Sequence, residues 1–110
     1  MSGSSINVVN LSGELDISRR NEIGAVLRVN GTETGILLDC HAVTYADSTA
    51  LAELLRFRNE AEAADIPVAI LVGSKQFARI IQYAGLGELF RLFDDRASAL
   101  TYLSNAGNAR

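Results

Sequence analysis

Residues 36–51 read ILLDCHAVTYADSTAL and carry the strongest structural signal in the chain. The run Ile36–Cys40 is apolar except for Asp39, which is typical of a parallel strand buried on both faces. A helix is predicted from about Ser48 to Ala64, because at about 100° per residue its apolar side chains fall on one arc, opposite Glu53, Arg56 and Glu60. That arc consists of Ala50, Leu51, Leu54, Phe57 and Ala61. A buried strand followed by an amphipathic helix favours an α/β fold.

The same alternation extends in both directions from this stretch. Further strands are predicted at residues 6–11, 68–72 and 89–93. Further helices are predicted at 17–29, at 75–84 with Gly85 placed to end it, and from a cap at Asp94 to Leu103. Strands and helices in this order predict a mostly parallel four-stranded sheet with right-handed crossovers and about four helices.

Length and composition fit one globular domain. The chain has 110 residues, of which 48% are hydrophobic and 21% charged, and a chain of this mass can bury roughly 65% of its extended surface. We expect the domain to span residues 6–103, between a flexible N-terminus at 1–5 and a flexible tail at 104–110. The net charge of −3 and the pI of about 5.0 argue against a nucleic-acid-binding protein, which would show a basic stripe.

The sequence favours a cytoplasmic protein without membrane insertion. No stretch approaches the ~18 apolar residues of a membrane span. The first residues lack the basic and apolar regions of a secretory signal. The chain has one Cys, which cannot form an internal disulfide and, with one His, cannot form a structural zinc site.

Enzyme motifs are weak throughout the chain. Gly85-Leu86-Gly87 lacks the third glycine of a phosphate-binding loop and is better explained as a helix stop. Cys40 and His41 are adjacent at a strand end and point in different directions, which favours a core Cys beside an exposed His over a catalytic pair. The paired Asp94 and Asp95 are explained by a helix start. We therefore expect no enzyme activity, no metal and no cofactor.

The segment Asp47-Ser48-Thr49 is harder to assign. It lies between the buried strand and the longest helix, so these three side chains crowd a helix N-terminus. N-capping by short oxygen-bearing side chains would explain one of them. A single cap does not require three such residues in a row, so a functional hydroxyl remains the alternative.

Three motifs resemble the STAS domain as found in bacterial anti-sigma factor antagonists. Its signature, an apolar strand ending in Asp and then Asp-Ser-Ser/Thr-Gly-Leu opening a helix, is similar to Ile36–Asp39 followed by Asp47–Leu51, with Ala50 in place of the glycine. The family motif Gly-Glu-Leu-Asp stands intact at residues 13–16, and a weaker match runs from Ala84-Gly85-Leu86 to Leu100. The resemblance implies a single STAS-like domain, from which the first strand of the family pattern is missing.

The resemblance also implies a function. In the antagonist family the unphosphorylated domain binds an anti-sigma factor that is also a serine kinase, and so frees a sigma factor. The kinase phosphorylates the serine after the signature Asp, which ends binding, and a PP2C-type phosphatase reverses the change. By motif position the phosphorylated residue here is Ser48. Phosphate at a helix N-terminus leaves the fold intact, while its bulk and charge disrupt an interface.

Helix periodicity extends the site into a stripe that runs from Ser48 down the helix. The residues expected to contact the partner are Glu14, Asp16, Asp47, Ser48, Thr49, Ala52, Leu55, Arg56 and Asn59. Arg56 has a second interpretation as an ion-pair partner of Glu53 or Glu60. For Gly13–Asp16 the alternative is a turn in which Gly13 leaves the strand, Leu15 enters the core and Asp16 caps the next helix.

Two other functions stay open from the sequence. The first is a constitutive STAS subunit of a transport or stress-signalling assembly, in which Ser48 is only a cap. The second is nucleotide binding, for which only the helix start at Ser48 resembles a phosphate site.

Overall fold

The computed structural model describes residues 6–108 and confirms the predicted α/β architecture. Four strands form one sheet in the order β1-β2-β3-β4, and every neighbouring pair is parallel. The strands are β1 (Ile6–Leu15), β2 (Gly35–Ala46), β3 (Val68–Val72) and β4 (Arg91–Phe93). The helices are α1 (Arg20–Val26), α2 (Ser48–Ala63), α3 (Lys75–Tyr83) and α4 (Arg96–Asn108), with 3-10 turns η1 (Ile17–Arg19) and η2 (Leu86–Glu88).

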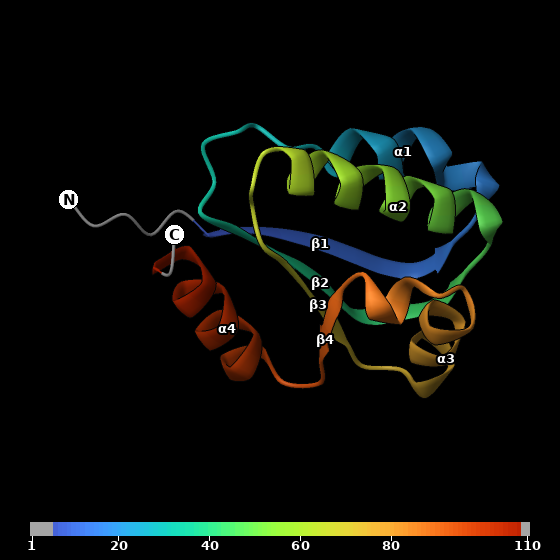
Figure 1. Cartoon of the computed structure of the whole chain (residues 1–110). Coiled ribbons are helices and arrows are strands. Elements are labelled where there is room, and N and C mark those ends of the chain that lie inside the picture. Colours follow the sequence, from blue (N-terminus) through green and yellow to red (C-terminus); the bar gives the residue numbers. More distant parts are fainter. Residues whose placement is uncertain (1–5, 109–110) are drawn as a thin grey trace.

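Helices cover both faces of the sheet, and β2 is buried between two cores. In Figure 1, α1 and α2 lie side by side over one face, and α4 lies against the other. Ile36, Leu38 and Cys40 point into the larger core, which also takes side chains from α1, α2 and α3. Leu37 points the opposite way into a smaller core with Leu103 of α4. This two-sided burial is what the uninterrupted apolar run predicts.

The predicted buried face of α2 is confirmed, and α3 also buries one face. Leu54 and Phe57 of α2 are fully buried, and so are Phe77 and Ile81 of α3. Gly85 follows α3 with φ of 80°, in the left-handed region, and its N–H donates to the Gln82 carbonyl. Glycine adopts this conformation without strain, so Gly85 ends the helix as predicted.

The first two strands are longer than predicted, which changes the role of Gly13. We expected β1 to end at Leu11 and a turn to begin at Gly13, but β1 continues to Leu15 and pairs with β2 as far as Ala46. The register shifts around Ser12 and again after Gly13, whose φ is 74°. Gly13 therefore accommodates an irregularity inside a strand and does not form a tight exit from it.

The boundaries of the other elements also differ from the prediction. A 3-10 turn precedes α1, so the α-helix occupies only Arg20–Val26, and η2 delays the start of β4 to Arg91. The cap of α4 is Asp95, not Asp94, because Asp95 Oδ1 accepts the Ser98 N–H at 2.8 Å. The helix then continues to Asn108, so residues 104–108, which the sequence assigned to a flexible tail, are helical. Residues 1–5, the expected flexible N-terminus, and 109–110 lie outside the described residues.

Candidate functional site

Asp47 joins the two segments that the sequence motifs single out. It precedes α2 with an extended backbone, and its Oδ1 accepts the Ala50 N–H at 3.1 Å. Its Oδ2 accepts the Ile17 N–H at 3.0 Å, and its own N–H donates to the Leu15 carbonyl at 3.0 Å. One side chain thus caps α2 and fixes the chain that leaves β1. We call these three hydrogen bonds the Asp47 clamp.

The clamp leaves Ser48 without a capping role. Ser48 is exposed in the first turn of α2, and within residues 6–108 its hydroxyl forms no hydrogen bond with another residue. It lines a shallow hollow together with Thr49, Ala52 and Glu53 of α2 and Arg20 of α1. Of the two interpretations of this segment, capping therefore belongs to Asp47, and the Ser48 hydroxyl is available for other chemistry.

The segment Glu14–Asp16 lies beside the clamp. Asp16 Oδ1 accepts the Ser18 N–H at 3.0 Å, so Asp16 caps the turn before α1, as predicted. Leu15 is fully buried, also as predicted. Glu14 is exposed opposite Tyr45 of β2. Glu14 and Asp16 therefore reach the same end of the sheet as Ser48.

Arg19 maintains the irregular end of β1. Its Nη1 donates to the carbonyls of Ser12 at 2.6 Å and Glu14 at 3.0 Å, and its Nη2 pairs with Glu22 at 2.9 Å. The hydrogen bond and charge of Glu22 raise the pKa of Arg19. The guanidinium thus satisfies backbone carbonyls at the point where the strand register shifts.

Beyond Thr49, the predicted stripe lines a shallow depression whose lining residues all belong to α2. Ala52, Leu55, Arg56 and Asn59 line it together with Glu60 and Ala63. Leu55 is 38% exposed, so its apolar side chain is accessible to a partner.

Arg56 is already engaged within the chain. Its guanidinium pairs with Glu53 at 3.0 Å and with Glu60 at 2.7 Å, and its Nη2 donates to the Leu27 carbonyl at 3.0 Å. These contacts match its interpretation as an ion-pair partner and also connect the end of α1 to α2. A direct contact of Arg56 with a partner stays a prediction.

Two residues of this surface were absent from the predicted site. Ile17 was predicted only as the first residue of a helix, and its side chain is 68% exposed beside the clamp. Arg20 lines the Ser48 hollow. The sequence does carry a signal for Ile17, because this apolar residue directly follows the capping Asp16. Nothing in the sequence pairs Arg20 with Ser48, because the two lie on different helices.

Cys40 is buried and His41 is exposed, as expected. Cys40 is fully buried, and burial raises the pKa of its thiol to about 12. His41 is exposed, and its Nδ1 lies 2.7 Å from Asp39 Oδ1. Asp39 also accepts a hydrogen bond from Arg96 of α4 at 2.8 Å. A thiol that stays protonated cannot act as a nucleophile at neutral pH.

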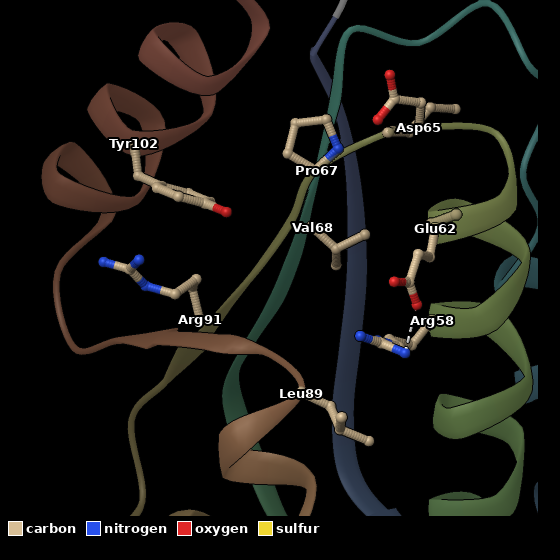
Figure 2. A pocket seen from close by; sticks show the side chains of 10 residues that line it. Arg58, Glu62, Asp65, Pro67, Val68, Leu89, Arg91 and Tyr102 are labelled. Carbon is tan, nitrogen blue, oxygen red and sulfur yellow. Dashed lines mark ion pairs between the residues drawn. The ribbon is translucent and has the colours of Figure 1, made fainter. Parts of the chain in front are cut away.

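A second hollow lies toward the other end of α2 (Figure 2), about 21 Å along the helix from Ser48 to Glu62. Its cavity volume is about 240 Å³, below the ~300 Å³ at which small-molecule pockets begin. Arg58 pairs with Glu62 at 2.5 Å, and Arg91 lies 4.8 Å from the centre of the Tyr102 ring. Its cations are therefore engaged within the protein, and it is separate from the predicted site.

Residues 6–108 contain no cluster of three His, Cys, Asp or Glu side chains suited to a metal ion. In the same part of the chain, no helix combines the length and apolar character needed to cross a lipid bilayer.

Comparisons with known proteins match this geometry. A family model described as STAS domain matches residues 3–99. No curated protein matches the chain. The solved structures that resemble this chain are less than 25% identical to it in sequence, so the similarity shows a shared fold.

Similar solved structures come from two kinds of protein. A sulfate transporter family protein from Wolinella succinogenes superposes with a TM-score of 0.82 at 19% identity, covering 94% of this chain and 88% of that one. An anti-sigma factor antagonist from Mycobacterium paratuberculosis gives 0.70 at 24% identity, with 94% and 90% covered. The anti-sigma factor antagonist SpoIIAA in its unphosphorylated form gives 0.67 at 20% identity, with 96% and 94% covered.

Proposed function

The chain belongs to the STAS-domain family, and on this basis we propose that it is an anti-sigma factor antagonist that acts by partner switching. Its unphosphorylated form binds an anti-sigma factor with serine kinase activity and so releases a sigma factor in the cytoplasm. Phosphorylation of Ser48 ends binding, and a PP2C-type phosphatase restores it. The chain itself has no catalytic role in this scheme.

The observation that carries the proposal is the unbonded, exposed hydroxyl of Ser48 next to the Asp47 clamp. A phosphate on Ser48 adds about −1.5 to −2 charges at pH 7. The helix dipole and the N-terminal N–H groups of α2 favour negative charge there. Because the clamp does not involve Ser48, the domain stays folded after modification, and the change acts on the surface alone.

The surface around Ser48 suits a protein partner. Ile17, whose N–H is bound by Asp47, and Leu55 of α2 expose large apolar side chains, and Glu14 adds an exposed charge. An apolar centre with a polar rim is typical of protein interfaces. A bulky dianion introduced next to it carries a desolvation cost and repels acidic groups of the partner.

The test uses a candidate anti-sigma factor kinase, sought first among the products of the neighbouring genes, with ATP, and mass spectrometry to locate the phosphate. We expect one phosphate on Ser48, none on Ser48→Ala, and unchanged modification of the neighbouring control Thr49→Val. In pull-downs, Ser48→Ala should stay bound in the presence of ATP, and Ser48→Asp should bind weakly. If both Ser48 variants bind like the parent, Ser48 is not the switch.

A second candidate function is supported by the similarity to the sulfate transporter family protein. Here the domain is a constitutive subunit of a transport or stress-signalling assembly and is not controlled by phosphorylation. The same experiment separates the two, because a constitutive subunit would bind its assembly equally well as Ser48→Ala and Ser48→Asp.

A further inference from the structure

Arg20 is the cation of the Ser48 hollow, whose other lining residues are Ser48, Thr49, Ala52 and Glu53. It is the first residue of α1, and its side chain is 67% exposed. Its ion-pair partner is Glu53, with Nε and Oε2 3.9 Å apart. That distance is too long for a hydrogen bond, so the guanidinium is held only loosely.

Glu53 does not depend on Arg20 for neutralisation. Its Oε1 accepts hydrogen bonds from Arg56, whose guanidinium lies 3.0 Å away. An exposed ion pair such as Arg20–Glu53 contributes little to stability, so Arg20 can leave Glu53 at small cost. The adjacent Arg19 cannot take its place, because its guanidinium is committed to Glu22 and to two carbonyls of β1.

We infer that Arg20 binds the phosphoryl group of phosphorylated Ser48 and exchanges Glu53 for it, a role that rests on the proposed function. A phosphoserine has three acceptor oxygens and about twice the charge of Glu53. The planar guanidinium binds two phosphate oxygens at once. In the protein phosphorylated at Ser48, Arg20 therefore holds the phosphate in position.

The other charged groups around Ser48 allow this exchange. Both carboxylate oxygens of Asp47 already accept N–H groups, from Ala50 and Ile17. Glu53 is held by Arg56. The dianion thus meets one loosely held cation and the N-terminus of α2. Binding of Arg20 would hold the phosphate in the hollow and connect the first turn of α1 to that of α2.

The experiment places phosphoserine at position 48 by genetic encoding, so it does not depend on a kinase. The second pKa of the phosphate is measured by ³¹P NMR in the otherwise unchanged chain, in Arg20→Gln and in the control Arg28→Gln. Arg28 is exposed just after α1 and outside the hollow, so its variant removes the same charge elsewhere.

We expect the phosphate pKa to lie below the usual value of about 6 and to rise by about 0.5 in Arg20→Gln, a threefold change in proton affinity. Arg28→Gln should leave it unchanged. Equal pKa values in the parent and Arg20→Gln would overturn the inference, as would equal shifts in both variants. A kinase that fails to modify Ser48 would instead refute the proposed function and leave this titration unaffected.

Discussion

Replacing Asp47 with alanine removes the side-chain part of the Asp47 clamp, and the structure gives the size of the effect. The lost bond to Ala50 is an N-cap, whose removal costs about 1 kcal/mol. The lost bond to Ile17 N joins two segments 30 residues apart, and an intramolecular hydrogen bond contributes about 1 kcal/mol. We therefore expect Asp47→Ala to lower the free energy of unfolding by about 2 kcal/mol. For a domain of 110 residues that corresponds to about 9 °C in melting temperature.

Two further variants make the assay specific. Asp47→Asn keeps a side-chain oxygen that caps helices as well as Asp does, but it cannot accept both N–H groups. Its free energy of unfolding should therefore fall by about half as much as that of Asp47→Ala. Asp94→Ala removes an exposed Asp next to the true cap of α4 and should change stability by less than about 0.5 kcal/mol.

The assay is urea and thermal denaturation of the four proteins. A shift in urea midpoint without a change in slope reports stability alone. If Asp47→Ala melts within about 2 °C of the parent, the clamp does not hold these segments together. Because the clamp also fixes the backbone next to Ser48, Asp47→Ala should be phosphorylated more slowly below its melting temperature.

The remaining predictions concern one surface charge and two buried groups. Glu14→Lys should change stability by less than about 0.5 kcal/mol because Glu14 is exposed, yet weaken kinase binding at low salt; unchanged affinity would make this segment scaffold only. Burial raises the pKa of Asp39, but the His41 hydrogen bonds and the charges of His41 and Arg96 outweigh it, so the pKa lies below its usual value. Asp39 therefore stabilises the fold above its unfolded pKa of about 3.9, and this stabilisation is lost as the pH falls through the lower folded pKa. The free energy of unfolding should therefore fall less steeply with acid in Asp39→Asn than in the parent. Parallel curves for the two proteins would contradict this. Burial raises the pKa of the Cys40 thiol to about 12, so iodoacetamide at pH 8 should label Cys40 only in urea; labelling of the native protein at the rate of the unfolded one would contradict its burial.

The elements that the sequence predicted well are those with a strong local pattern. The period of α2 and the apolar runs of β2 and β3 reflect burial that neighbouring residues share. The extension of β2 past Cys40 has no such pattern, because His41 and Ala42 are exposed and only Val43 and Ala46 are buried. It depends on pairing with β1, 30 residues away in sequence, which local periodicity does not encode.

The residues of the candidate site differ in the same way, because local sequence signals some of them and only the fold brings in the others. Asp47 and Ser48 are adjacent to a helix start, so spacing and resemblance pointed to both, but not to which of them caps. The Ala50 N–H shows that Asp47 is the cap, and the Ile17 N–H reaches Asp47 Oδ2 only through the fold. Arg20 belongs to the site through the packing of α1 against α2, which no spacing along the chain predicts.

The division of labour between Asp47 and Ser48 favours the switch over the constitutive subunit. A domain that needs only a stable helix start could cap α2 with Ser48 itself, since serine caps about as well as aspartate. Here Asp47 caps α2 and also fixes Ile17, and the neighbouring hydroxyl is left exposed in the hollow with Arg20. If the unmodified serine were itself the cap, phosphorylation would replace its capping bond and change the helix start along with the surface. Phosphorylation of Ser48 breaks no hydrogen bond between its hydroxyl and another residue of the range 6–108, so the change falls on the surface at the start of α2.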